Sequence, residues 1–179
     1  PSLGKFGKQR DPSAIGIGGF DRENGILYIV KMLIKKRLPD RIISDIIELQ
    51  RQYMCIAWAI ESVQFQEFLR TELVKRSAKM GVPVPAVPVH PHADKELRIE
   101  ALQPHCANGL ILFHTEQTTV IDQFKHFPKG GHDDGCDCVE MLHKIAQQYG
   151  QIHQIQEIVI PEPNMYQMNF GGFGTFNSW

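Results

Sequence analysis

The feature that most constrains this chain is an acidic stretch within the run Phe127 to Leu142. His132, Asp133, Asp134 and Asp137 lie within six residues, directly after a glycine pair and directly before a run of periodically spaced apolar residues. Aspartate is unfavourable inside a helix but favourable at a helix start, where its carboxylate meets unpaired N–H groups. The stretch therefore predicts the first turn of a helix, which continues through Val139, Leu142, Ile145 and Ala146.

The aspartates of this stretch also have the spacing of a metal site. Asp134 and Asp137 are three residues apart and Asp133 and Asp137 are four apart, so their side chains share one helix face. Like charges at that spacing repel unless a cation or a proton relieves them. Because carboxylate oxygens suit hard divalent ions, the pattern favours magnesium or manganese.

The stretch has three other interpretations. A capped, solvated helix start needs no ligand and stays open. Zinc would use His132 with Cys136 and Cys138, but one residue separates the cysteines instead of the usual two to four. A phosphate at the helix N-terminus would be repelled by the carboxylates unless a metal bound first.

Composition limits the class of protein more than its function. A chain of 179 residues suits one medium domain with a substantial core. With 19 basic against 20 acidic residues, nucleic-acid binding would need a local basic face. The four cysteines have no framework spacing, which is typical of free thiols in a reducing cytoplasm. No apolar run approaches the ~20 residues that span a bilayer, and no signal peptide is recognisable, so we expect no membrane association.

Hydrophobic periodicity predicts alternating strands and helices. The Asn24-Gly25 pair marks a hairpin between the opening strands, and the proline–valine alternation of 81–90 indicates an extended edge strand. The long helix after Glu61 should bury Phe65, Phe68, Leu69 and Leu73. The expected strands are 13–20, 26–34, 55–60, 81–90 and 110–113, and the expected helices are 39–53, 64–79, 95–102, 118–126 and 134–149.

Glu61 stands out because it ends a short, continuously apolar strand and precedes a helix. In open α/β sheets ligands bind at that edge. The element order predicts an α/β fold, a mixed sheet with helices on both faces, in which Glu61 and the aspartates converge. This is the layout of a ribonuclease-H-like nuclease, in which two metal ions activate water.

The motifs also resemble a known family. They comprise residues 1–5, 11–15, Lys95 to Pro104, Asn108-Gly109 before a strand, and 127–137. In this order they resemble the C-terminal nuclease domain of tailed-bacteriophage terminase large subunits, the motors of genome packaging. The resemblance covers 1–149, which is expected to be the nuclease domain. Residues 150–179 are expected to be a partly flexible C-terminal extension, with a possible strand at 158–160.

The resemblance implies a metal-dependent endonuclease that cleaves concatemeric double-stranded DNA during packaging, with two Mg²⁺ or Mn²⁺ ions. It maps one acid onto Glu61 and another onto Asp134, with Asp133 and Asp137 as further ligands and His132 in support. A first acid would immediately precede Pro1, so we expect the chain to be a fragment, with an ATPase domain N-terminal to it. The expected basic face for DNA comprises Lys5, Lys8, Arg10, Lys95, Arg98 and Lys129.

The implied partners, besides DNA, are the portal protein and the terminase small subunit, in the host cytoplasm with transient docking on the procapsid. Two alternatives stay open: another ribonuclease-H-like nuclease, acting on DNA junctions or RNA–DNA hybrids, and a non-catalytic module that grips DNA or the portal. No phosphate-binding Gly-x-x-x-x-Gly-Lys-Ser/Thr motif occurs in the chain, so it does not itself carry the expected ATPase site.

Overall fold

The computed structural model describes residues 12–61, 64–90 and 94–152. Its first sheet contains the antiparallel strands β1 (Ser13–Asp21) and β2 (Ile26–Lys35), and β5 (Ile111–Phe113) lies parallel to β2. The connecting turn uses Gly25 at φ 69°, and the Asp21 carboxylate accepts the backbone N–H of Glu23 at 2.9 Å. The predicted hairpin is therefore confirmed, with glycine at the position that needs a positive φ.

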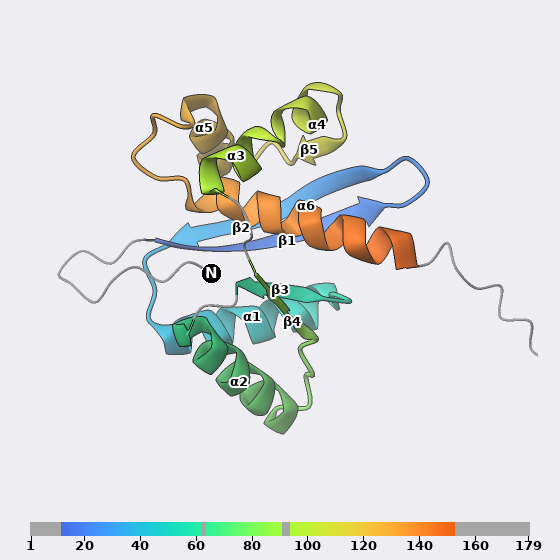
Figure 1. Cartoon of the computed structure of the whole chain (residues 1–179). Coiled ribbons are helices and arrows are strands. Elements are labelled where there is room, and N and C mark those ends of the chain that lie inside the picture. Colours follow the sequence, from blue (N-terminus) through green and yellow to red (C-terminus); the bar gives the residue numbers. More distant parts are fainter. Residues whose placement is uncertain (1–11, 62–63, 91–93, 153–179) are drawn as a thin grey trace, which may run out of the picture.

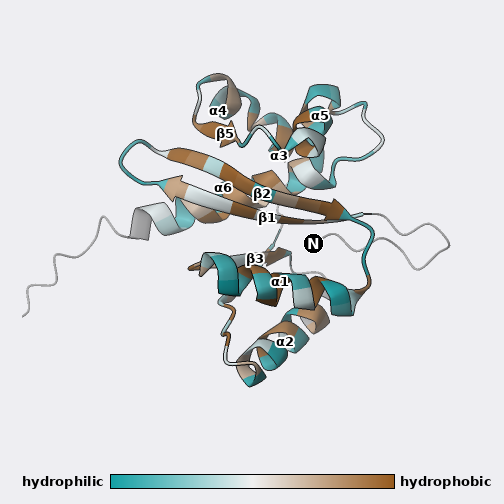
Figure 2. Ribbon diagram, turned by 180° about the vertical axis from the view of Figure 1, so that it is seen from behind, coloured by the Kyte–Doolittle hydropathy of each residue, from teal (hydrophilic) through white to brown (hydrophobic). Residues whose placement is uncertain are grey.

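A second sheet pairs β3 (Trp58–Glu61) with β4 (Ala86–Val89) in parallel. Helices α1 (Pro39–Tyr53) and α2 (Gln64–Lys79) accompany it, on one side of β1 in Figure 1. The isoleucine stripe of α1 is buried, and the Trp58 ring N–H donates to Gln50 Oε1 at 2.6 Å. Figure 2 shows hydrophobic residues along β1 and β2 and alternating character around α1, as expected of an amphipathic helix.

The remaining helices are α3 (Lys95–Glu100), α4 (Gln103–Ala107), α5 (Thr118–His126) and α6 (Asp134–Ile152). In Figure 1 α6 lies along β1 and β2, and α3, α4 and α5 lie beyond it with β5. Alternate residues of β1 face opposite layers: Ile15 and Ile17 pack with α1, and a Cβ at Gly16 would meet Leu142 of α6. Helices thus cover both faces of the first sheet, and the mixed α/β class is confirmed.

The structure departs from the sequence expectations in several places. The expected strand 55–60 begins only at Trp58, and the expected strand 81–90 is reduced to Ala86–Val89. The expected helix 95–102 ends at Glu100 as α3, and a helix that the sequence did not predict, α4, follows it with a proline in its first turn. Phe68 is 63% exposed, because the buried stripe of α2 follows Leu69 and Leu73, four residues apart. The expected single mixed sheet is two sheets in the part of the chain that the structure describes. The possible strand 158–160 and the rest of the expected extension beyond 152 lie outside the described residues.

The space between the two sheets is a cavity of about 400 Å³. Within the described ranges β1 pairs with β2 alone and β3 with β4 alone, so the edges of β1 and β3 that line this cavity have no ladder partner. Helices α1 and α6 contribute Ile46, Tyr53, Leu142 and Ile145 to its walls. Asp134 and Asp137 line it as well.

Candidate acidic site

The site is built on the first turn of α6. Asp134 and Asp137 are only 8% and 9% exposed, which is unusual for aspartate. The turn sits against α5, because the Gly135 N–H donates to Gln123 Oε1 at 2.8 Å and so gains a partner that the helix itself cannot supply. The helix start predicted from the sequence is confirmed, and its apolar continuation through Val139 and Ile145 is buried.

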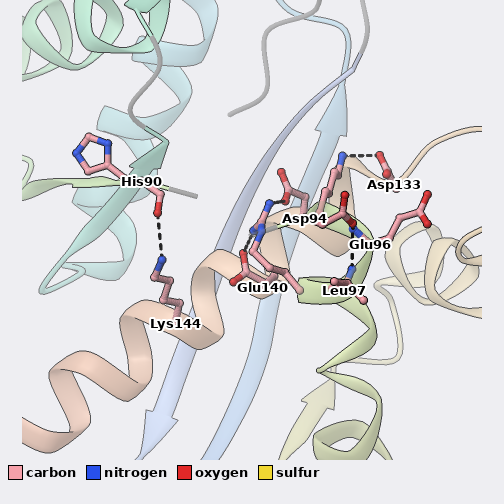
Figure 3. Close-up of polar contacts among 10 residues, drawn as sticks. His90, Asp94, Glu96, Leu97, Asp133, Glu140 and Lys144 are labelled. Atoms are coloured by element: carbon pink, nitrogen blue, oxygen red, sulfur yellow. Dashed lines mark hydrogen bonds and ion pairs between the residues drawn. The ribbon is translucent and has the colours of Figure 1, made fainter. Parts of the chain in front are cut away.

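Helix α3 brings two cations to these acids. The Lys95 ammonium lies 2.8 Å from Asp133 Oδ1, and Arg98 Nη2 lies 3.2 Å from Asp137 Oδ1. Arg98 Nη1 also donates to Glu140 Oε2; the dashed lines of Figure 3 run to Asp133 and Glu140. Lys95 and Arg98 therefore share one face of α3 and pair with the acidic face of α6.

The start of α3 is itself fixed. Asp94 Oδ1 accepts the backbone N–H groups of Glu96 at 2.9 Å and Leu97 at 3.4 Å, as an N-cap residue does (Figure 3). Ile99 of the same helix is buried at 2% exposure. The cap and the buried isoleucine together hold α3 in the orientation in which its cations meet α6.

Titration reflects this pairing. Partial burial acts to lower the pKa of Lys95, but its hydrogen bond to Asp133 and the charges of Asp137, Asp133 and Asp134 outweigh that effect and raise it. Burial raises the pKa of Glu140, and the charge of Arg98 opposes this only in part. The site is therefore a partly desolvated cluster, in which the neighbouring carboxylates favour the charged form of Lys95 and burial disfavours the charged form of Glu140.

Glu61 lies at the C-terminal end of β3, as the sequence predicts. It lines a small cavity of about 10 Å³ with Asp137 and Glu140 of α6 and with Arg98, Lys144 and Val89. The Lys144 ammonium donates to the His90 carbonyl at 3.2 Å, which ties α6 to the chain after β4 (Figure 3). The fold thus brings the end of the second sheet to the acidic turn of α6.

The other sequence candidates are placed differently. Asp133 is half-buried on its ion pair with Lys95, whereas His132 and Lys129 are exposed in the loop before α6. Lys5, Lys8 and Arg10 lie outside the described residues. Arg98, expected to contact DNA, has a side chain only 15% exposed and is engaged with two carboxylates.

Sequence reasoning missed Glu140, Lys144 and Gln123. Glu140 follows Asp137 by three residues and Lys144 follows Glu140 by four, so extending the acidic helix face by two turns would have found both. The part played by Gln123 had no sequence signal, because its contact with Gly135 depends on how α5 packs against α6.

The chemistry of the side chains favours metal binding, whereas their arrangement does not. Carboxylate oxygens suit magnesium or manganese. However, among the residues that the structure describes, no three His, Cys, Asp or Glu side chains are gathered as a metal would need. For zinc, burial raises the pKa of Cys136 to about 12 and that of Cys138 to about 11, which opposes the thiolate form that zinc requires.

No family model matches the chain, and no curated protein matches it. In the described ranges, no helix combines the length and apolar character needed to cross a membrane. The structure therefore establishes a mixed α/β protein with a partly buried acidic site, and its function is argued from that site.

Proposed function

We propose that this chain is a metal-dependent endonuclease of the ribonuclease-H-like type, the nuclease part of a phage terminase large subunit. The observation that carries the proposal is the convergence of Glu61, from the end of β3, with Asp137, from the first turn of α6, on one small cavity. Asp134 lies one turn earlier on α6 and is equally buried. Acids from a strand end and a helix start thus meet at one end of the fold.

In this proposal Glu61, Asp134 and Asp137 are the metal-binding carboxylates, with Asp133 and His132 beside them. Two Mg²⁺ or Mn²⁺ ions would supply water activation and stabilisation of the leaving oxygen of a phosphodiester. The described acids make an incomplete ligand set, since Asp133 and Asp137 are occupied by Lys95 and Arg98. Completing the site calls for a further acid close to Asp134.

The cavity between the sheets suggests where that acid comes from. The start of β1 lies beside the start of α6, since a Cβ at Gly16 would lie near Cys138, and the end of β1 lies beside the end of α6, since a Cβ at Gly150 would lie near Phe20. The strand and the helix therefore run in the same direction, and the acids of the first turn of α6 lie near the start of β1. A strand in the cavity, antiparallel to β1 and parallel to β3, would end beside Asp134. We propose that the further acid is carried by a strand in this position, which would also join the two sheets.

The same proposal places the N-terminal ATPase domain, the portal protein and the terminase small subunit as partners in the host cytoplasm. Double-stranded DNA would lie across the acidic end, contacted by the basic residues that flank it in sequence, Lys5, Lys8, Arg10 and Lys129. With near-balanced net charge, binding should be weak at physiological salt and should fall further as salt rises. Lys95 and Arg98 would contact phosphate only by giving up their carboxylates.

A second candidate function, a non-catalytic module that grips DNA or the portal, is favoured by one observation. Asp133 and Asp137 already have cationic partners, so the acidic turn is electrostatically satisfied without a metal. In that case α3 and α6 form a structural ion-pair network, and the acids serve the fold.

Asp134→Asn separates the two functions, because it removes one negative charge and keeps the size of the side chain. We expect the parent to nick plasmid DNA with Mn²⁺ but not with excess EDTA, and to melt at a higher temperature with Mn²⁺. The variant should lose cleavage by orders of magnitude and most of the Mn²⁺ stabilisation. Asp122→Asn is the control for the change of charge, since Asp122 is 71% exposed on α5 and pairs with His126.

Cleavage that persists in excess EDTA would refute the metal mechanism. A destabilised Asp134→Asn that responds to Mn²⁺ as the parent does would favour the structural role. Parallel assays on a four-way junction and an RNA–DNA hybrid identify the substrate class among ribonuclease-H-like nucleases. Plasmid cleavage alone is the result expected of a packaging enzyme.

A further inference from the structure

Arg98 contacts two carboxylates of α6 with one side chain. Its Nη2 lies 3.2 Å from Asp137 Oδ1 and its Nη1 donates to Glu140 Oε2. The side chains of Arg98, Asp137 and Glu140 are 15%, 13% and 12% exposed, so water screens their charges only in part. A guanidinium is planar and has donors on two nitrogens, which suits it to bridge two carboxylates in a fixed geometry.

Asp137 is also one of the carboxylates that a divalent ion would need. A metal ion bound to Asp137 would share that carboxylate with the positive guanidinium of Arg98. Two cations bound to one carboxylate lie close together and repel strongly where water is partly excluded. Arg98 also lines the small cavity that contains Glu61 and Asp137. Its charge therefore borders the cavity on which the two elements of the proposed site converge.

We propose that Arg98 is a tethered counter-cation of the acidic site, which holds Asp137 and Glu140 in place without metal and competes with the metal ion for Asp137. This inference rests on the proposed function and deepens it. Arg98 is thereby a positioning residue of the site and has no place on the DNA face. Metal binding then has two parts, release of Asp137 by Arg98 and ligation of the ion.

The test is Arg98→Gln, which removes the charge and keeps a polar side chain. Isothermal titration with Mn²⁺ should give a Kd at least about tenfold lower than that of the parent, the equivalent of about 1.4 kcal/mol. The metal-free melting temperature should fall, because two partly buried carboxylates lose their cation. Added Mn²⁺ should then raise the melting temperature more in the variant than in the parent.

Two further variants separate charge from structure. Arg37→Gln is the control for the loss of a buried arginine. Arg37 Nε lies 2.9 Å from Asp45 Oδ2, and the two side chains are 4% and 12% exposed. This variant should destabilise the fold without changing the Kd for Mn²⁺. Arg98→Lys keeps the positive charge but cannot bridge two carboxylates, so its Kd should stay close to the parent value. If Arg98→Gln unfolds without metal, the titrations are made in sucrose, which stabilises compact states.

Each outcome decides the proposal. The proposal is supported if Arg98→Gln has a lower Kd for Mn²⁺ than the parent and Arg98→Lys and Arg37→Gln do not. A Kd equal to that of the parent, with only a lower metal-free melting temperature, makes Arg98 a structural residue and overturns it while the metal-dependent nuclease still stands. An Arg98→Lys variant that binds Mn²⁺ as tightly as Arg98→Gln also overturns it, because charge would then not be the cause. If parent and variant alike show no Mn²⁺ response, both the metal site and the role of Arg98 are refuted.

Discussion

Substitution of Gly135 tests the geometry of the acidic helix start. A Cβ at this position would overlap Gln123 Oε1 and would lie 2.8 Å from Ile34 Cδ1 and 3.0 Å from Val120 Cγ2. Gln123 Oε1 is also the acceptor of the Gly135 N–H at 2.8 Å. With a larger residue at 135, the ends of the Gln123 and Ile34 side chains must shift or the first turn of α6 must move away from β2 and α5.

The expected cost of Gly135→Ala follows from these contacts. Displacing Gln123 loses a hydrogen bond worth about 0.5–1.5 kcal/mol. Overpacking against Ile34 and Val120 costs about 1–3 kcal/mol. Alanine regains up to about 1 kcal/mol through its higher helix propensity. Since the two closest atoms are ends of flexible side chains, we expect a net loss of about 1–3 kcal/mol, which lowers the melting temperature by about 2–12 °C for a chain of this size.

Urea unfolding followed by circular dichroism measures the effect, with Gly131→Ala as the control. Gly131 lies in the loop just before α6 and a Cβ there meets nothing within 4 Å, so its substitution should be near neutral. In a Gln123→Ala background Gly135→Ala should cost less, because the overlapping amide is gone. A neutral or stabilised Gly135→Ala, or strictly additive effects in the double variant, would refute this account of the helix start.

Two other predictions concern the thiols near the start of α6 and the cavity between the sheets. Burial is the chief cause that raises the pKa of Cys138 to about 11 and that of Cys136 to about 12. At pH 8 iodoacetamide should therefore alkylate Cys138 roughly a hundredfold, and Cys136 roughly a thousandfold, more slowly in the folded than in the unfolded chain. Equal rates by mass spectrometry would contradict their burial. An extension of about six β-branched residues before Pro1 should slow amide exchange along β1 and β3, since a strand of that length matches the cavity edge of β1. A glycine–serine extension of equal length is the control, and equal protection by both would argue against an inserted strand.

Local features of the sequence determined the elements. The hairpin at Asn24-Gly25, the isoleucine stripe of α1 and the helix start at Asp134 each depend on residues a few positions apart, where turn chemistry, periodicity and capping act. Helix α5 has the limits that the sequence predicts, 118–126. The position of Glu61 at a strand end was also predictable, because a short, continuously apolar run precedes it.

Only the tertiary structure decided how the acids are used. Arg98 reaches Asp137 and Glu140 across 39 and 42 residues, and Gln123 reaches Gly135 from another helix. In the described residues β3 and β4 form a sheet separate from the first one, and this separation depends on which strand edges pair in the tertiary structure. The sequence indicates which residues carry charge, but whether an aspartate faces a metal, a cation or water depends on how α3 packs against α6, and no local pattern encodes that packing.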